Sequence, residues 1–237
     1  MKKAFLSLLS LLLMVTLTQA QDDGPKLAKQ AGRALTSYNI NPSDNADKLE
    51  EAKSKIDRAI EVAEVQEDAS AWITRGEIYN TIIQREAARM MIDTSAHFSG
   101  DNDALVAFRS FQQGYNRAKK DYQRADAVKG AGEVQGHLIN IGVTKYERGE
   151  YEKAFQSFEA ALQCHDMLKA QDKKSLLDEP AQLDNQVYIT ALAAQLAERN
   201  AEAEKYYQQL YRAGTDKPAV YEGLYNLKVA TGDQAAA

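Results

Sequence analysis

Four stretches of the sequence repeat one pattern of apolar side chains, and this recurrence constrains the fold more than any other feature. Each stretch starts with an alanine and has a large side chain four residues later, followed by apolar or small residues at the seventh and eighth positions. That spacing places all four side chains on one stripe of an α-helix. The stripes are Ala52, Ile56, Ala59 and Ile60; Ala107, Phe111, Gly114 and Tyr115; Ala154, Phe158, Ala161 and Leu162; and Ala203, Tyr207, Leu210 and Tyr211.

A second helical stretch precedes each stripe and carries a small residue near its middle. In the last two cases this residue lies 12 positions before the stripe, as in the step from Gly142 to Ala154, and a turn residue lies between them. Helices joined this closely form antiparallel hairpins. The first two pairs have longer connections. The four small residues are Gly32, Gly76, Gly142 and Ala191.

The composition favours an all-α chain. The 237 residues include only 4 Pro and 13 Gly, with 44% hydrophobic and 27% charged residues, whereas sandwiches and barrels of strands need frequent turns. Cys164 is the single cysteine and there are 3 His. An internal disulfide and a structural zinc cluster are therefore excluded.

Two segments resemble the tetratricopeptide repeat, a helix-turn-helix unit of roughly 34 residues. The stretch from Trp72 through Gly76 to Tyr79 has the family's Trp, Gly and Tyr spacing, and the stretch from Leu138 to Leu162 matches nearly a whole repeat. The resemblance implies an all-α fold, an α-α superhelix built as a solenoid of helical hairpins. It implies a single domain at 21–237, with hairpins at about 26–66, 69–119, 134–166 and 184–213 and a final helix at 218–231. Before the third hairpin, Gly130–Gly136 is expected to be a flexible connection.

Residues 1–20 have the pattern of a secretory signal peptide. Lys2 and Lys3 precede an apolar run from Ala4 to Leu17, and small or polar residues then lead to Ala20. The run is shorter than the roughly 20 apolar residues with which a helix spans a bilayer. We therefore expect cleavage after Ala20, a periplasmic or secreted protein, and no stable membrane insertion after cleavage. An uncleaved anchor is the alternative.

The charge balance and the scattered functional groups argue against nucleic-acid binding and catalysis. Without residues 1–20 the chain has 27 Lys and Arg against 34 Asp and Glu, a formal net charge of −7, and such a chain repels phosphate backbones. The histidines His97, His137 and His165 are isolated, and Cys164 ends an apolar stripe where burial is expected. We expect no catalytic residues, no metal site, no cofactor and no enzymatic activity.

The resemblance to tetratricopeptide repeats also implies a binding surface. In such a solenoid the first helix of each hairpin lines a concave groove that accepts a peptide or a partner helix. The groove would be basic at one end, and apolar and aromatic in the middle. Carried over onto this sequence, the candidate groove residues are Lys29, Arg33, Ile73, Glu77, Asn80, Ile139, Val143, Tyr146, Tyr188, Gln195 and Asn226.

These features favour one function and leave two alternatives. The favoured function is a non-catalytic protein–protein interaction scaffold of the cell envelope that binds a protein or peptide partner in the concave groove. The chief alternative is a helical glycan or small-ligand binding protein working with an outer-membrane system, which an aromatic pocket closed by residues 81–103 would support. An enzyme would require a buried carboxylate or histidine with a shifted pKa in a cleft.

Overall fold

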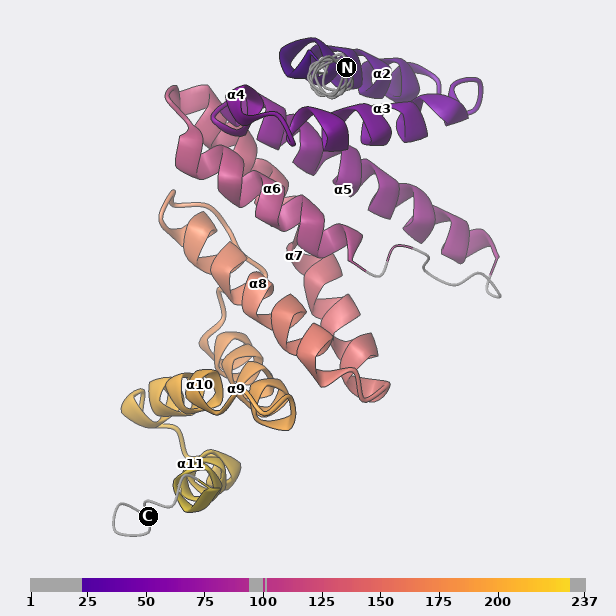
Figure 1. Cartoon of the computed structure of the whole chain (residues 1–237). Helices are drawn as coiled ribbons and strands as arrows, with labels where there is room; N and C mark the ends of the chain where they lie inside the picture. The colour runs from indigo at the N-terminus through magenta and orange to yellow at the C-terminus, as the bar shows by residue number, and fades with distance from the viewer. Residues whose placement is uncertain (1–22, 94–99, 101, 231–237) are drawn as a thin grey trace, which may run out of the picture. The chain divides into compact units, whose positions relative to one another are not determined.

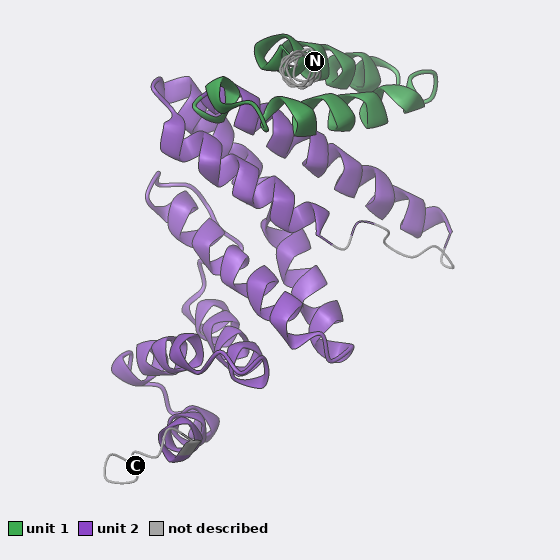
Figure 2. Cartoon of the chain, viewed as in Figure 1, with its two compact units in different colours: residues 1–67 green, residues 68–237 purple. Residues whose placement is uncertain are grey.

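Every regular element of the described chain is an α-helix. The computed structural model describes residues 23–93, 100 and 102–230 (Figure 1), and the all-α fold class predicted from the sequence is confirmed. The chain divides into two compact units, residues 1–67 and residues 68–237 (Figure 2), whereas the sequence pattern predicts one continuous domain. We call these unit 1 and unit 2.

Unit 1 is a helical hairpin followed by a single helical turn. The N-cap residue Asp23 accepts a hydrogen bond at Oδ1 from the backbone N–H of Lys26 at 3.0 Å, which satisfies a free donor of the first turn. Asn45 stabilises the loop between the two helices of the hairpin, because its Nδ2 donates to the carbonyl oxygens of Ser37 and Asn41, both at 3.1 Å. The helices are α2 (Gly24–Ile40), α3 (Ala46–Ala59) and α4 (Ala63–Gln66).

Unit 2 contains three hairpins and a last helix, each packed mainly on its neighbours along the chain (Figure 1). Neighbour-to-neighbour packing is typical of solenoids. The first helices of the hairpins are α5 (Ala69–Ile92), α7 (Asp121–Glu147) and α9 (Pro180–Leu196), and α11 (Pro218–Ala230) follows them in the series. The second helices are α6 (Asp103–Arg117), α8 (Tyr151–Lys169) and α10 (Asn200–Arg212).

An aromatic ring from each second helix of unit 2 packs on a glycine of a first helix. The ring of Phe111 lies against both Gly76 and Gly130: a Cβ atom added at these glycines would come within 2.6 Å and 2.2 Å of its carbon atoms. The stripe aromatic is 1% exposed in all three second helices. Gly76 and Gly130 are therefore notches that let a neighbouring ring approach. The same contact joins Phe158 to Gly142 and Tyr207 to Gly223.

The expectation of a flexible connection at Gly130–Gly136 is wrong, because α7 runs through this segment without interruption. Gly130 is a packing notch, and the apolar residues around it, such as Ala127 and Val134, are completely buried. Burial of this face offsets the low helix propensity of the glycines. The third hairpin consequently begins at Asp121, well before residue 134.

Some expectations concern residues outside the described ranges, namely the signal peptide at 1–20, the position of His97 and the end of the last helix at 231. Within the described ranges, no helix combines the length and the apolar character that a bilayer-spanning segment requires.

Replacing Gly130 with alanine should destabilise the protein, although alanine favours helix. The new Cβ would lie 2.2 Å from Cε1 of Phe111, a ring that is 1% exposed and cannot move without disturbing the core. Overpacking costs about 1–3 kcal/mol, against a gain in helix propensity of about 1 kcal/mol. We expect the free energy of unfolding, measured by urea denaturation, to fall by about 1 kcal/mol.

Gly136→Ala in the same helix is the matched control. Its Cβ would meet Cδ1 of Leu176 at 3.3 Å, and Leu176 is 56% exposed and able to shift. The gain in helix propensity should dominate here, so the free energy of unfolding should rise by up to about 1 kcal/mol. Equal effects of the two substitutions would contradict the role given to the Phe111 ring.

Candidate functional site

Four tyrosines from four successive helices of unit 2 gather at one place, and we call them the tyrosine cluster. The ring centroids of Tyr146 and Tyr151 are 5.5 Å apart in an edge-on arrangement, and those of Tyr188 and Tyr207 are 6.4 Å apart. Tyr146 and Tyr188 are half-buried at the margin of the core formed by α8, α9 and α10. Edge-on and tilted ring pairs are favourable contacts, so the four rings hold one another in place.

Two phenol groups of the cluster, those of Tyr146 and Tyr207, have a raised pKa. Burial, followed by the neighbouring hydroxyls of Tyr188 and Tyr146, raises the pKa of Tyr207 to about 12, and its hydroxyl donates to Oε1 of Gln195 at 2.9 Å. Burial also raises the pKa of Tyr146. The ammonium group of Lys217 lies 5.4 Å from the centroid of the Tyr188 ring, a cation–π contact that adds positive charge beside the aromatic surface.

Apolar side chains extend this surface along α7. Ile139, Val143 and Tyr146 are spaced four and three residues apart and therefore share one face of the helix. Ile139 is half-buried and contacts the cores on both sides of α7, whereas Val143 is 41% exposed. Together, the exposed valine and the half-buried tyrosines form a surface on which an apolar side chain of a ligand can be buried.

An acidic group lies further along unit 2, where α5 packs on α7. Glu77 is exposed, yet the surrounding protein, followed by the carboxylates of Asp126 and Glu133, raises its pKa, while Lys129 lowers it. We call these three carboxylates, Glu77, Asp126 and Glu133, the acidic cluster. Asn80 beside it is 4% exposed and donates from Nδ2 to Oε2 of Glu133 at 2.8 Å, whereas its Oδ1 has no hydrogen-bond partner.

The structure brings only part of the predicted groove together. Tyr146, Tyr188 and Gln195 meet at the tyrosine cluster, with Ile139 and Val143 on the same helix as Tyr146. Glu77 belongs to the acidic cluster, whereas the prediction for Asn80 is wrong, because this side chain is 4% exposed and is used in a hydrogen bond to Glu133. The remaining predicted residues of the described chain that keep an exposed surface belong to neither cluster: Lys29 and Arg33 in α2 of unit 1, and Asn226 in α11.

The prediction that Ile73 lines the groove is wrong, because this side chain is 7% exposed and its Cγ1 packs against Gly114 of α6. It belongs to the interface within the α5–α6 hairpin and presents no surface to a partner. Sequence reasoning in turn missed Tyr151, Lys217 and the two carboxylates of α7. Asp126 and Glu133 were missed because the glycines that follow them disguise the first half of α7, which the hydrophobic spacing of Ala127, Val128 and Ala131 could have revealed.

The described residues contain no group of three or more His, Cys, Asp or Glu side chains placed to hold a metal ion. Cys164 is fully buried as expected, its thiol donates to the carbonyl oxygen of Ala131 at 2.9 Å, and burial raises its pKa to about 12. Burial lowers the pKa of His137, and Nδ1 of His165 is hydrogen-bonded to the Ser175 hydroxyl at 2.9 Å. A thiol of such high pKa is a poor nucleophile, so Cys164 serves packing.

The fold and the two clusters define a helical-hairpin repeat protein with an aromatic and acidic surface. No protein-family model and no curated protein matches this sequence. Among solved structures, the chain is similar to one described as "Functional Characterization of Pseudomonas Aeruginosa pilF", with 15% sequence identity, 89% of this chain and 71% of that chain covered, and a TM-score of 0.30. At this TM-score the two chains do not superpose over their whole lengths. The fold is therefore described from the helix packing of this chain alone.

Glu77→Gln should stabilise the protein at neutral pH. The pKa of Glu77 is raised from its ordinary value of 4.5 in the folded chain, so the folded state binds a proton more tightly than the unfolded state. The free energy of unfolding therefore falls as the pH rises from the pKa of Glu77 in the unfolded chain to its higher pKa in the folded chain. We expect the variant to have the higher thermal midpoint at pH 7, and the difference to shrink as the pH falls toward 4.5.

Glu147→Gln, at an exposed position on α7, serves as the control for this comparison and should leave the midpoint unchanged at every pH. A Glu77→Gln variant that is less stable than wild type at pH 7 would disprove the desolvation of Glu77.

Proposed function

We propose that this protein is a non-catalytic interaction scaffold of the bacterial cell envelope, which binds a peptide segment of a partner protein on the first helices of unit 2. The half-buried Tyr146 and Tyr188 of the tyrosine cluster, extended by the exposed Val143, carry the proposal. Tyrosine side chains offer large contact areas at low entropic cost and are enriched among the residues that dominate binding energy.

The two clusters determine the chemistry of the segment. An aromatic or branched apolar side chain would be buried at the tyrosine cluster, while phenol hydroxyls and Gln195 would bond its backbone. A lysine or arginine of the segment would pair with the acidic cluster, where Glu77 is exposed and partly desolvated. Such a pair would reduce the repulsion among the three carboxylates, which Lys129, 3.9 Å from Oε1 of Glu133, already offsets in part.

A glycan is the second candidate ligand, and the half-exposed faces of Tyr146 and Tyr188 favour it specifically. Tyrosine rings with neighbouring hydrogen-bond donors suit the apolar faces and hydroxyls of sugars. The acidic cluster would have no function toward a neutral sugar, and this separates the two candidates.

Export is part of the proposal and has its own test. The full-length chain, expressed in a Gram-negative host, should appear in the periplasmic fraction without its first 20 residues, because small residues precede a cleavage site after Ala20. Mass spectrometry of the purified protein should give Gln21 as the first residue. An uncleaved chain in the membrane fraction would refute the proposed export.

The peptide-binding function is tested by selecting binders from a random peptide library displayed on phage. Selected peptides should combine an aromatic or branched apolar residue with a basic residue. Combining Tyr146→Ala and Tyr188→Ala should weaken the binding of a synthetic selected peptide by about tenfold or more, since truncation of a central tyrosine costs about 2 kcal/mol. Fluorescence anisotropy of the labelled peptide gives the dissociation constants.

Tyr122→Ala is the matched control, because Tyr122 is an exposed tyrosine on the same helix at about 36 Å from Tyr146 along the helix axis. It should bind the peptide as wild type does, and Glu77→Gln should weaken only peptides with the basic residue. Failure to select peptides, together with tyrosine-dependent binding on a glycan array, would replace the peptide with a sugar as the ligand.

A further inference from the structure

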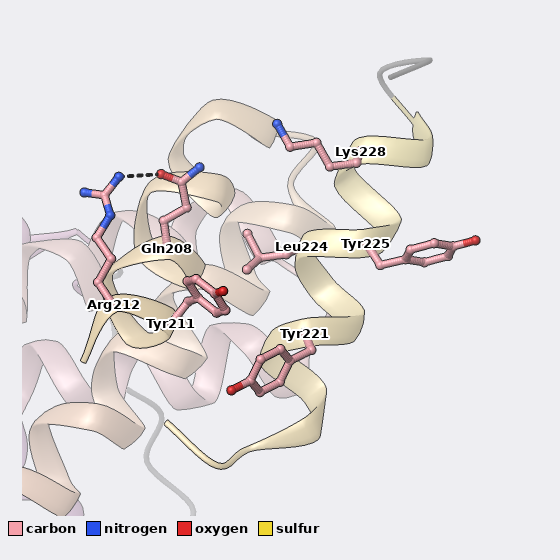
Figure 3. A pocket seen from close by; sticks show the side chains of 7 residues that line it. All are labelled: Gln208, Tyr211, Arg212, Tyr221, Leu224, Tyr225 and Lys228. Atoms are coloured by element: carbon pink, nitrogen blue, oxygen red, sulfur yellow. Dashed lines mark hydrogen bonds between the residues drawn. The ribbon is translucent and has the colours of Figure 1, made fainter. Parts of the chain in front are cut away.

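The last helix of unit 2 lies beside a cleft of about 650 Å³ between α10 and α11 (Figure 3). Tyr211 and Tyr221 meet in it with ring centroids 5.8 Å apart, and the Tyr221 hydroxyl donates to the carbonyl oxygen of Thr215 at 2.8 Å, which fixes its ring. The other lining residues are Gln208, Arg212, Leu224, Tyr225 and Lys228. The cleft shares no residue with the tyrosine cluster or the acidic cluster, so its occupant is independent of the proposed peptide binding.

The register of the repeats shows what kind of group this cleft accommodates. The residues of α11 that line it follow the corresponding residues of α9 by 34 positions. Those α9 residues are 0–1% exposed beneath the neighbouring helices, whereas their counterparts in α11 are exposed or only half-buried: Leu224 packs partly on the core and Lys228 pairs with Glu204 of α10. The cleft is thus a seat for a helix. The pairs are Val187 and Tyr221, Thr190 and Leu224, Ala191 and Tyr225, and Ala194 and Lys228.

An apolar stripe on α11 itself is also uncovered. Tyr221, Tyr225 and Val229 follow one another at four-residue spacing on one face, and they are 47%, 55% and 42% exposed. Tyr211 of α10 adds a side chain that is 55% exposed. Exposed apolar side chains scattered singly are ordinary, but three on one helix face with a fourth on the neighbouring helix mark an interaction surface.

Opposite charges flank this stripe on its two sides. Lys228 faces α10, where its Nζ lies 2.9 Å from Oε1 of Glu204, and Arg212 of α10 lies on the same side of the stripe. Glu222 lies on the other side of the Tyr221–Tyr225 line, by the 100° step between helix residues. Within the described chain, Arg212 bonds only the amide oxygen of Gln208, and neither Arg212 nor Glu222 has a partner of opposite charge.

We infer that the occupant of this seat is a second copy of the chain, paired through α11. A two-fold axis running roughly parallel to α11 places opposite flanks of the two helices together. Glu222 of each copy then faces Arg212 of the other at the level of Tyr221, while the stripes bury their tyrosines against each other. Each unpaired charge gains a partner from the same contact, and a surface that is complementary to itself in this way is what a two-fold dimer requires.

The surface is small, so the dimer is reversible. With tyrosine side chains of roughly 150–250 Å², the half-exposed stripe would remove roughly 400 Å² from each copy, and flanking polar residues would bring the total only to the lower end of specific interfaces. Dissociation constants of such interfaces are on the order of 10 µM or weaker.

Sedimentation velocity of the purified full-length gene product, from about 5 to about 500 µM, tests the inference. We expect a concentration-dependent shift from monomer to dimer. Tyr225→Lys should raise the dissociation constant by about tenfold or more, because it buries a charge in the stripe. Tyr122→Lys, at a tyrosine of similar exposure on α7, should leave the constant unchanged.

A charge exchange provides the sharper test. Arg212→Glu and Glu222→Arg should each weaken the dimer, because each places like charges together, and the two combined should restore it. Both positions are on the surface, and unchanged circular dichroism would confirm that each variant is folded. A protein that stays monomeric throughout the range, or a dimer that neither Tyr225→Lys nor the charge exchange affects, would overturn the inference.

Discussion

The contact between an aromatic ring of a second helix and a glycine of a first helix is the interaction on which the rest of unit 2 depends. Phe111 occupies the space left by the absent side chains of both Gly76 and Gly130, so it fixes α6 against α5 and α7 at once. Close-packed contacts of this kind tolerate little change in volume. They determine how far apart the first helices lie, and hence which of their side chains meet.

Two surfaces follow from this arrangement. Because the stripes of the second helices are used for packing, Tyr146 and Tyr188 remain at the surface of the first helices, where a ligand can reach them. Within the part of the chain that the structure describes, α11 lacks the cover that α9 has, and its side chains Tyr221 and Tyr225 are 47% and 55% exposed. One surface suits a ligand segment, and the other suits a second copy of the chain, so dimerisation would give each assembly two ligand sites and higher avidity.

The fold could be predicted from the sequence because its packing contacts follow helical spacing, as the stripe that contains Phe111 does. The length of α7 was not predicted, because Gly130 resembles a flexible residue until the ring that packs on it is known, although the helical spacing of Ala127, Val128 and Ala131 indicates it. In the site, the repeat register predicted Tyr146, Tyr188 and Gln195 as groove residues, and the structure places them near one another. It failed for Ile73, whose orientation depends on how closely α6 approaches α5 at Gly114, a distance that no local pattern encodes.

The position of a bound peptide tests the account most directly. A photo-crosslinking residue, p-benzoylphenylalanine, is placed at Val143 on the first helix α7 or at Gln163 on the second helix α8, both exposed positions. With a peptide that binds in the micromolar range, the account predicts a covalent adduct from position 143 and none from position 163. An adduct from position 163 alone would show that the second helices bind the ligand, and would contradict the division between packing helices and binding helices.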